Sequence, residues 1–203
     1  MSPARRALIW SVFAAVVVAP ISAAAMSPLL AWRHTVYIAA GFAGVIAMAL
    51  LLVQPLLAGG YLPGLSVRRG RNVHRWTGGA LIAAVATHVA GLWITSPPDV
   101  ADALLFASPT PFSAWGVIAM WAVFGAALLA AFRGRFRQRL RSWRRAHTAL
   151  VSVTVIGSVA HAMMIEGTME TVSKTLLCVF TLAATGKAVA DFRAWATRSH
   201  RDP

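Results

Sequence analysis

The stretch RNVHRWTGGALIAAVATHVAG, residues 71–91, places His74 and His88 on a largely apolar run. An apolar stretch of about 20 residues can cross the hydrocarbon layer of a membrane as a helix. An ionisable side chain is costly there, so each histidine is a candidate functional residue. The rest of the chain decides whether the stretch is one membrane span of several and what a pair of histidines does on it.

The composition indicates an integral membrane protein. Of the 203 residues 58% are hydrophobic and only 12% are charged, which is not the composition of a soluble domain. The formal charge is +13, but the basic residues are confined to short segments between apolar runs, so no nucleic acid partner is expected. The single cysteine, Cys178, excludes an internal disulfide and a CxxCH haem attachment motif.

Six apolar runs are long enough to span a bilayer. They cover residues 7–25, 35–58, 77–95, 112–132, 148–165 and 172–190. The sequence therefore predicts an all-α membrane protein, a six-transmembrane-helix bundle that forms a single domain over residues 1–203. The segment 96–113, rich in Pro, Asp and Ser, is expected to be a loop with one short helical turn.

Charge asymmetry predicts the orientation, because Lys and Arg accumulate in cytoplasmic segments. Alternate joints hold 17 of the 19 basic residues: Arg5, Arg6, Arg68, Arg69, Arg71, Arg75, Arg133, Arg135, Arg137, Arg139, Arg141, Arg144, Arg145, Lys187, Arg193, Arg198 and Arg201. The other joints hold Arg33 and Lys174. Both termini are thus expected in the cytoplasm. The first run also resembles a cleavable signal peptide, and its removal would leave the rest of the topology unchanged.

A second histidine pair repeats the spacing of the first. His147 and His161 on the fifth run are 14 residues apart, as are His74 and His88. Fourteen residues of α-helix advance about 21 Å and come within about 40° of whole turns, so each pair shares one helix face. Because the two runs cross in the same direction, His74 faces His147 on the inner side and His88 faces His161 nearer the outer side.

Two facing imidazoles can ligate a haem iron from both sides of the ring, so the two pairs predict two haems stacked across the membrane. Zinc fits less well, since it takes four ligands at one point. For each histidine alone, a hydrogen-bonded core residue remains the alternative. Arg75, Arg144 and Arg145 beside the inner pair could bind haem propionates or act only as interfacial anchors. Trp76 and Trp143 are expected to be interfacial belt residues.

The segments HRWTGGALIAAVATH and HTALVSVTVIGSVAH, with the arginine-rich joint before the second, resemble the ferric reductase-like transmembrane domain. This family includes ferric reductases, NADPH oxidases and the haem-binding subunit of a periplasmic methionine sulfoxide reductase system. The resemblance covers the six-span core. It implies non-covalent b haems that carry electrons across the membrane, with His74, His88, His147 and His161 as axial ligands.

The resemblance also implies partners. The oxidases carry a cytoplasmic FAD and NADPH region after the last span, and no such region is expected here, because the segment after the last run is short and has no glycine-rich motif. The expected donor is therefore a cytoplasmic flavoprotein reductase, a quinol or a separately bound flavin or quinone. Ferric iron, a periplasmic redox protein or oxygen is the expected outer acceptor. The sulfoxide reductase subunit lacks a histidine where His74 stands, which favours a two-haem conduit in a bacterial cytoplasmic (inner) membrane.

Two rival interpretations stay open at this point. A quinone-coupled cytochrome b subunit of a dehydrogenase would use the same haem chemistry but would need a quinone pocket near a haem edge. A haem-free small transporter or assembly factor would use the histidines for a proton path. The haem content of the purified protein separates this last class from the others.

Overall fold

A computed structural model describes residues 1–198, with the backbone alone described for residues 137, 138 and 193–198. Arg201, and the side chains of Arg137, Arg193 and Arg198, therefore lie outside the described part. Within it every regular element is helical. The helices are α1 (Pro3–Ala25), η1 (Pro28–Leu30), α2 (Thr35–Ala58), α3 (Val67–Thr95), α4 (Pro97–Leu104), α5 (Pro111–Ala131), η2 (Arg133–Arg139), α6 (Leu140–Met164) and α7 (Thr171–Arg198).

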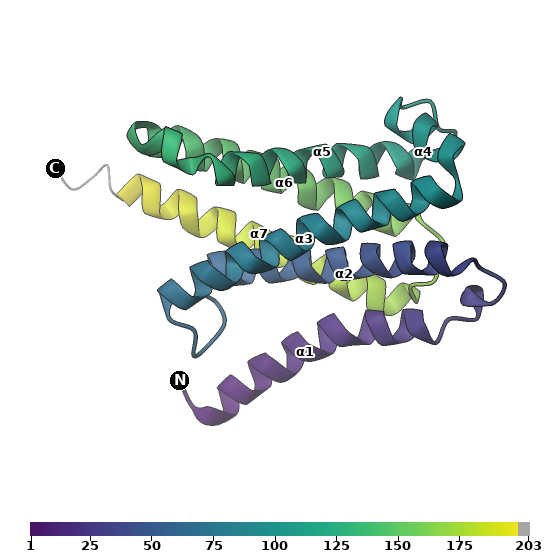
Figure 1. Cartoon of the computed structure of the whole chain (residues 1–203). Helices are drawn as coiled ribbons and strands as arrows, with labels where there is room; N and C mark the ends of the chain where they lie inside the picture. Colours follow the sequence, from purple (N-terminus) through teal and green to yellow (C-terminus); the bar gives the residue numbers. More distant parts are fainter. Residues whose placement is uncertain (199–203) are drawn as a thin grey trace.

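Six of the described helices, α1, α2, α3, α5, α6 and α7, are long and apolar enough to cross a membrane. The predicted six-span, all-helical fold is confirmed. The start of α1, the start of α3, the α5–α6 joint and the end of α7 lie at one end of the bundle (Figure 1). These are the basic segments, so the structure gathers them at one end. The assignment of that end to the cytoplasm rests on the charge pattern.

Two spans begin at least eight residues before the predicted limits. Helix α3 begins at Val67 rather than at 77, and α6 at Leu140 rather than at 148. The predicted limits followed the apolar runs, whereas the helices continue into the arginine-rich segments, whose long side chains can keep their charge in water. The side chain of Ser66 caps α3 by accepting a hydrogen bond from the backbone N–H of Arg69 (3.4 Å). His74 and His147 thus lie inside regular helices. The segment after α3 contains the eight-residue helix α4, not one turn.

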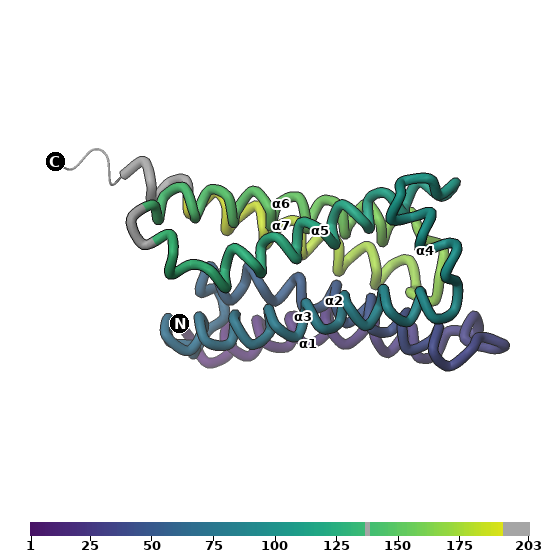
Figure 2. The backbone as a smooth tube through the Cα atoms, turned by 45° about the horizontal axis from the view of Figure 1, so that its top comes forward, coloured from purple at the N-terminus to yellow at the C-terminus, as the bar shows by residue number. Residues whose placement is uncertain are grey.

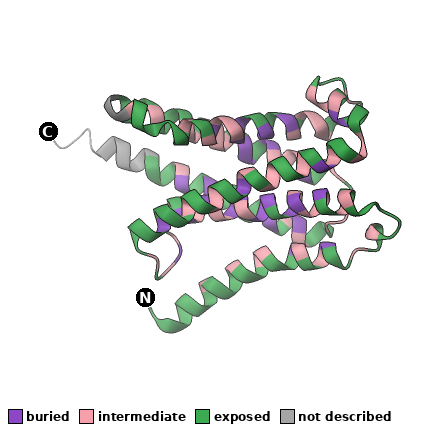
Figure 3. Cartoon of the chain, viewed as in Figure 1, coloured by how far each residue is buried: buried purple, intermediate pink, exposed green. Residues whose placement is uncertain are grey.

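Four of the membrane helices form two hairpins, and α7 and α1 pack against them. Helix α2 packs along α3, and α5 packs along α6, whereas the two hairpins contact each other only sparsely. Figure 2 shows them as two layers. Helix α7 packs against α2 and α6 and closes one side between the layers. Helix α1 is mostly exposed (Figure 3) and contacts α7 and α2. This arrangement leaves the histidine-bearing helices α3 and α6 in different layers.

Polar contacts fix α7 near both ends. Lys174 is buried, and its Nζ donates a hydrogen bond to the carbonyl oxygen of Ile165 at the end of α6 (2.8 Å). Near the other end, the hydroxyl of Tyr61 donates to the carboxylate of Asp191 (2.6 Å). Burial and this hydrogen bond raise the pKa of Tyr61 to about 12. The phenol therefore stays protonated, and able to donate this bond, throughout the physiological pH range.

Candidate cofactor site between two helical hairpins

His88 of α3 and His161 of α6 face each other across the gap between the hairpins. Their ring centroids are 6.5 Å apart and their planes meet at 79°. Two imidazole nitrogens that each lie about 2 Å from one metal ion put the ring centroids about 6 Å apart. The separation therefore suits an iron held between the two rings. The sequence predicted this pair, and the structure brings it together.

In both histidines the ring nitrogen Nδ1 bonds to a backbone carbonyl. Nδ1 of His88 bonds to the carbonyl oxygen of Ala40 on α2, and Nδ1 of His161 to that of Phe112 on α5, both at 2.8 Å. A carbonyl only accepts, so each Nδ1 carries a proton, and in the neutral imidazole Nε2 then keeps its lone pair. A hydrogen bond from Nδ1 to a carbonyl fixes the tautomer and the ring orientation of a metal-binding histidine and raises its basicity.

Two glycines make these carbonyls reachable. A helical side chain leans toward the N-terminus, so the residue at i+4 covers the carbonyl of residue i. Gly44 follows Ala40 by four residues, and Gly116 follows Phe112 by four. A Cβ on Gly44 would lie 3.0 Å from Nδ1 of His88, and a Cβ on Gly116 would lie 2.7 Å from Nδ1 of His161.

The sequence contains a signal for these glycines that our sequence analysis missed. The pentapeptide GVIAM occurs twice, at residues 44–48 and 116–120, and begins each time with the glycine under a histidine. Helices α2 and α5 therefore carry related segments, as α3 and α6 carry the same histidine spacing. The α2–α3 and α5–α6 hairpins are internal repeats, and each supplies one histidine to each pair together with the carbonyl that faces it.

The inner pair is held less tightly. Nδ1 of His74 bonds to the carbonyl oxygen of Gln54 at 3.3 Å. Nδ1 of His147 is buried near the carbonyl of Ala126 without reaching hydrogen-bonding geometry. The residues four positions on, Ala58 and Ala130, carry a Cβ where the outer pair has glycine. The covered carbonyls explain the longer contact and the missing bond.

Gln54 lies next to Pro55 near the end of α2. In the structure its side chain is buried, and Nε2 donates to Oγ1 of Thr77 on α3 (2.9 Å). Gln54 therefore makes two contacts with α3 near the inner pair: its side chain bonds to Thr77, and its backbone carbonyl bonds to His74. A polar residue in an apolar run was the available signal for this role.

The arginines predicted near the inner pair lie at the same end of the bundle as His74 and His147 (Figure 1). His147 lies within electrostatic range of His74, and Arg75 lies within electrostatic range of His74. The side chains of Arg75, Arg144 and Arg145 are exposed at the same end of the bundle. Their position is compatible with propionate binding and also with interfacial anchoring.

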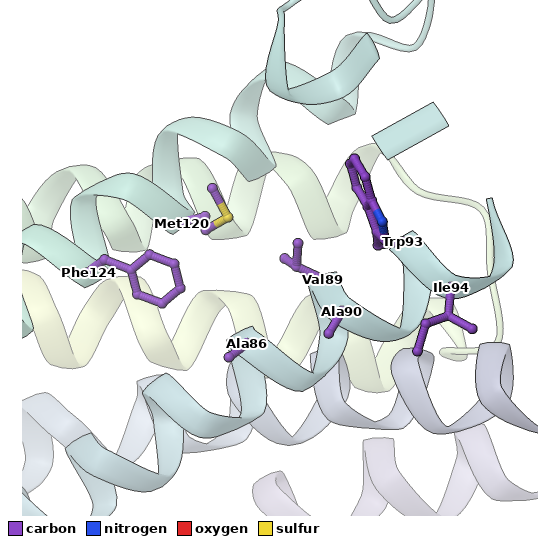
Figure 4. Close-up of a pocket in the computed structure, with 7 residues that line it drawn as sticks. All are labelled: Ala86, Val89, Ala90, Trp93, Ile94, Met120 and Phe124. Carbon is purple, nitrogen blue, oxygen red and sulfur yellow. The ribbon is translucent and has the colours of Figure 1, made fainter. Parts of the chain in front are cut away.

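A separate cavity of about 450 Å³ opens between α3 and α5 (Figure 4). Its lining is apolar: Ala86, Val89, Ala90, Trp93, Ile94, Met120 and Phe124. Ala86 and Ala90 point about 160° away from His88 around α3. On α3 the cavity thus opens on a face that points away from His88.

Among residues 1–192, the side chains described by the structure form no group of three or more His, Cys, Asp or Glu able to hold a metal ion. The outer histidine pair offers two ligands whose rings face each other. A porphyrin supplies four further nitrogens in the plane between them, so the donor set fits haem iron.

The fold and the site define a multi-pass membrane protein with histidine pairs between two repeated hairpins. The chain belongs to the ferric reductase like transmembrane component family, whose model matches residues 40–158. The match runs from Ala40 to Ser158, so it includes three of the four paired histidines and ends before His161. No curated protein and no solved structure matches the chain significantly. The family assignment makes the chain a membrane component of a redox family.

Proposed function

We propose that the protein is a di-haem b cytochrome that carries electrons across the membrane. His88 and His161 hold one haem, and His74 and His147 hold the other. The observation that carries this proposal is the outer pair: two imidazoles 6.5 Å apart, each with Nδ1 bonded to a carbonyl that a glycine uncovers. That geometry leaves both Nε2 atoms free for one iron.

Haem supplies an iron that changes oxidation state by one electron, and the chain supplies ligation, orientation and a dry environment. The Ala40 and Phe112 carbonyls hold the outer rings in place before the iron binds. The two hairpins contact each other only sparsely, and α7 packs against both through α2 and α6. The two levels are about 21 Å apart along the helices.

In this proposal electrons enter at the arginine-rich end, which faces the cytoplasm of a bacterial inner membrane and carries both termini. A cytoplasmic flavoprotein reductase, a quinol or a separately bound flavin or quinone is the donor. Ferric iron or a periplasmic redox protein at the other end is the acceptor. Arg75, Arg144 and Arg145 bind the propionates of the inner haem.

Haem content tests the proposal directly. Detergent-purified protein is expected to show a low-spin b-type visible spectrum and about two haems per chain by the pyridine hemochrome assay, because each histidine pair supplies both axial ligands. Protein that folds and binds no haem even when haem is supplied would refute the proposal and favour a haem-free transporter.

The two haems are expected to differ in reduction potential. Nδ1 of each outer ligand bonds to a carbonyl oxygen at 2.8 Å. At the inner pair, Nδ1 of His74 bonds at 3.3 Å, and Nδ1 of His147 forms no such bond. Stronger bonds make the imidazole a better donor and stabilise ferric iron, while the nearby arginines stabilise ferrous iron. We therefore expect the inner potential to be higher, on the order of 60 mV, which is about a tenfold ratio for one electron.

A redox titration followed by visible and EPR spectra measures this difference, and a histidine variant that keeps a single haem assigns each step. A lower potential for the inner haem would contradict the expectation.

A further inference from the structure

Trp143 on α6 forms the closest ring contact of the inner site. Its indole stacks on the imidazole of His147, with centroids 5.2 Å apart and planes at 6°. Nε1 of Trp143 donates a hydrogen bond to the carbonyl of Leu129 in the last turn of α5 (2.8 Å). The guanidinium of Arg133 lies 5.3 Å from the centre of the indole ring. The indole is therefore fixed by contacts of its own.

His147 is the paired histidine that most needs such a contact. Nδ1 of each of the other three bonds to a backbone carbonyl, whereas Nδ1 of His147 lies near the Ala126 carbonyl without forming such a bond. An imidazole without this bond can rotate about its side-chain torsions, which weakens its hold on a metal. A parallel indole at stacking distance limits that rotation.

Trp76 shows that the stack is not a general feature of interfacial tryptophans. Trp143 precedes His147 by four residues, so the two side chains share a helix face. Trp76 follows His74 by two residues, points elsewhere and is 82% exposed. Trp76 and Trp143, both expected to be belt residues, therefore differ, because Trp143 is half-buried and stacks on a histidine.

We propose that Trp143 is a positioning residue: its indole, held by Leu129 and covered by Arg133, fixes the imidazole plane of His147 in place of the missing Nδ1 hydrogen bond. This inference rests on the proposed function, because the ring that it orients is the inner haem ligand.

The test compares Trp143→Leu, Trp143→Phe and the control Trp76→Leu in detergent-purified full-length protein supplied with haem. We expect Trp143→Leu to lower the occupancy of the inner haem several-fold, or to shift its EPR g values, while the outer haem signal stays unchanged. Trp143→Phe keeps an aromatic face and is expected to retain the inner signal. Trp76→Leu is expected to match the wild type.

The outer haem signal reports whether each variant folds. Unchanged inner and outer signals in Trp143→Leu would overturn the inference and leave the proposed function intact. Loss of both signals in both Trp143 variants would also overturn it, since the role of the indole would then be general packing. A wild-type protein without haem would instead refute the proposed function.

Discussion

Replacing His161 with alanine is expected to halve the haem content, from about two haems per chain to about one. His161 supplies one of the two protein ligands of the outer iron, and low-spin b haem needs both. His88→Ala is expected to give the same loss, because its ring faces that of His161 at 6.5 Å. The measurement is the pyridine hemochrome value combined with the EPR spectrum.

The inner variants complete this test. His147→Ala is expected to remove the other haem, and the double variant His147→Ala with His161→Ala is expected to bind none. His34→Ala is the matched control, since His34 caps α2 outside the pairs by accepting a hydrogen bond from the backbone N–H of Val36. Pairing by level would be wrong if His88→Ala and His161→Ala removed different spectral components.

Gly116→Ala is expected to weaken the outer haem strongly although it adds a single methyl group. The new Cβ would lie 2.7 Å from Nδ1 and 2.8 Å from Cε1 of His161, so the ring must move away from the Phe112 carbonyl. Overpacking of this kind costs about 1–3 kcal/mol, which corresponds to roughly 5- to 150-fold weaker binding. Titration of apoprotein with haem measures the change.

The chain offers graded controls for this variant. Gly44→Ala places its Cβ 3.0 Å from His88, so we expect a smaller loss at the same haem. Gly41→Ala lies one turn earlier on α2, where a Cβ meets nothing within 4 Å; it is expected to leave binding unchanged, since alanine also favours helix. Equal haem affinity in Gly116→Ala and Gly41→Ala would show that Gly116 does not position His161.

Much of the fold could be predicted because hydropathy and charge act locally. The six runs and the alternation of basic joints follow from the cost of placing polar groups in hydrocarbon. The starts of α3 and α6 could not be read from hydropathy, because a helix backbone satisfies its own hydrogen bonds whether its side chains lie in lipid or at the interface. The eight-residue α4 was underestimated for a similar reason, since a polar segment with prolines also suits a helix that begins at proline.

The sequence by itself determined which histidines share a helix face, since the 14-residue step and helix geometry are enough to place His74 with His88 and His147 with His161. Only the tertiary structure decided how each imidazole is held. The Ala40 and Phe112 carbonyls and the clearance at Gly44 and Gly116 depend on how neighbouring helices pack. Spacing along one helix carries no information about the carbonyl that the next helix presents. This is why the four histidines, which have the same spacing in the sequence, differ in the hydrogen bonds that their Nδ1 atoms form.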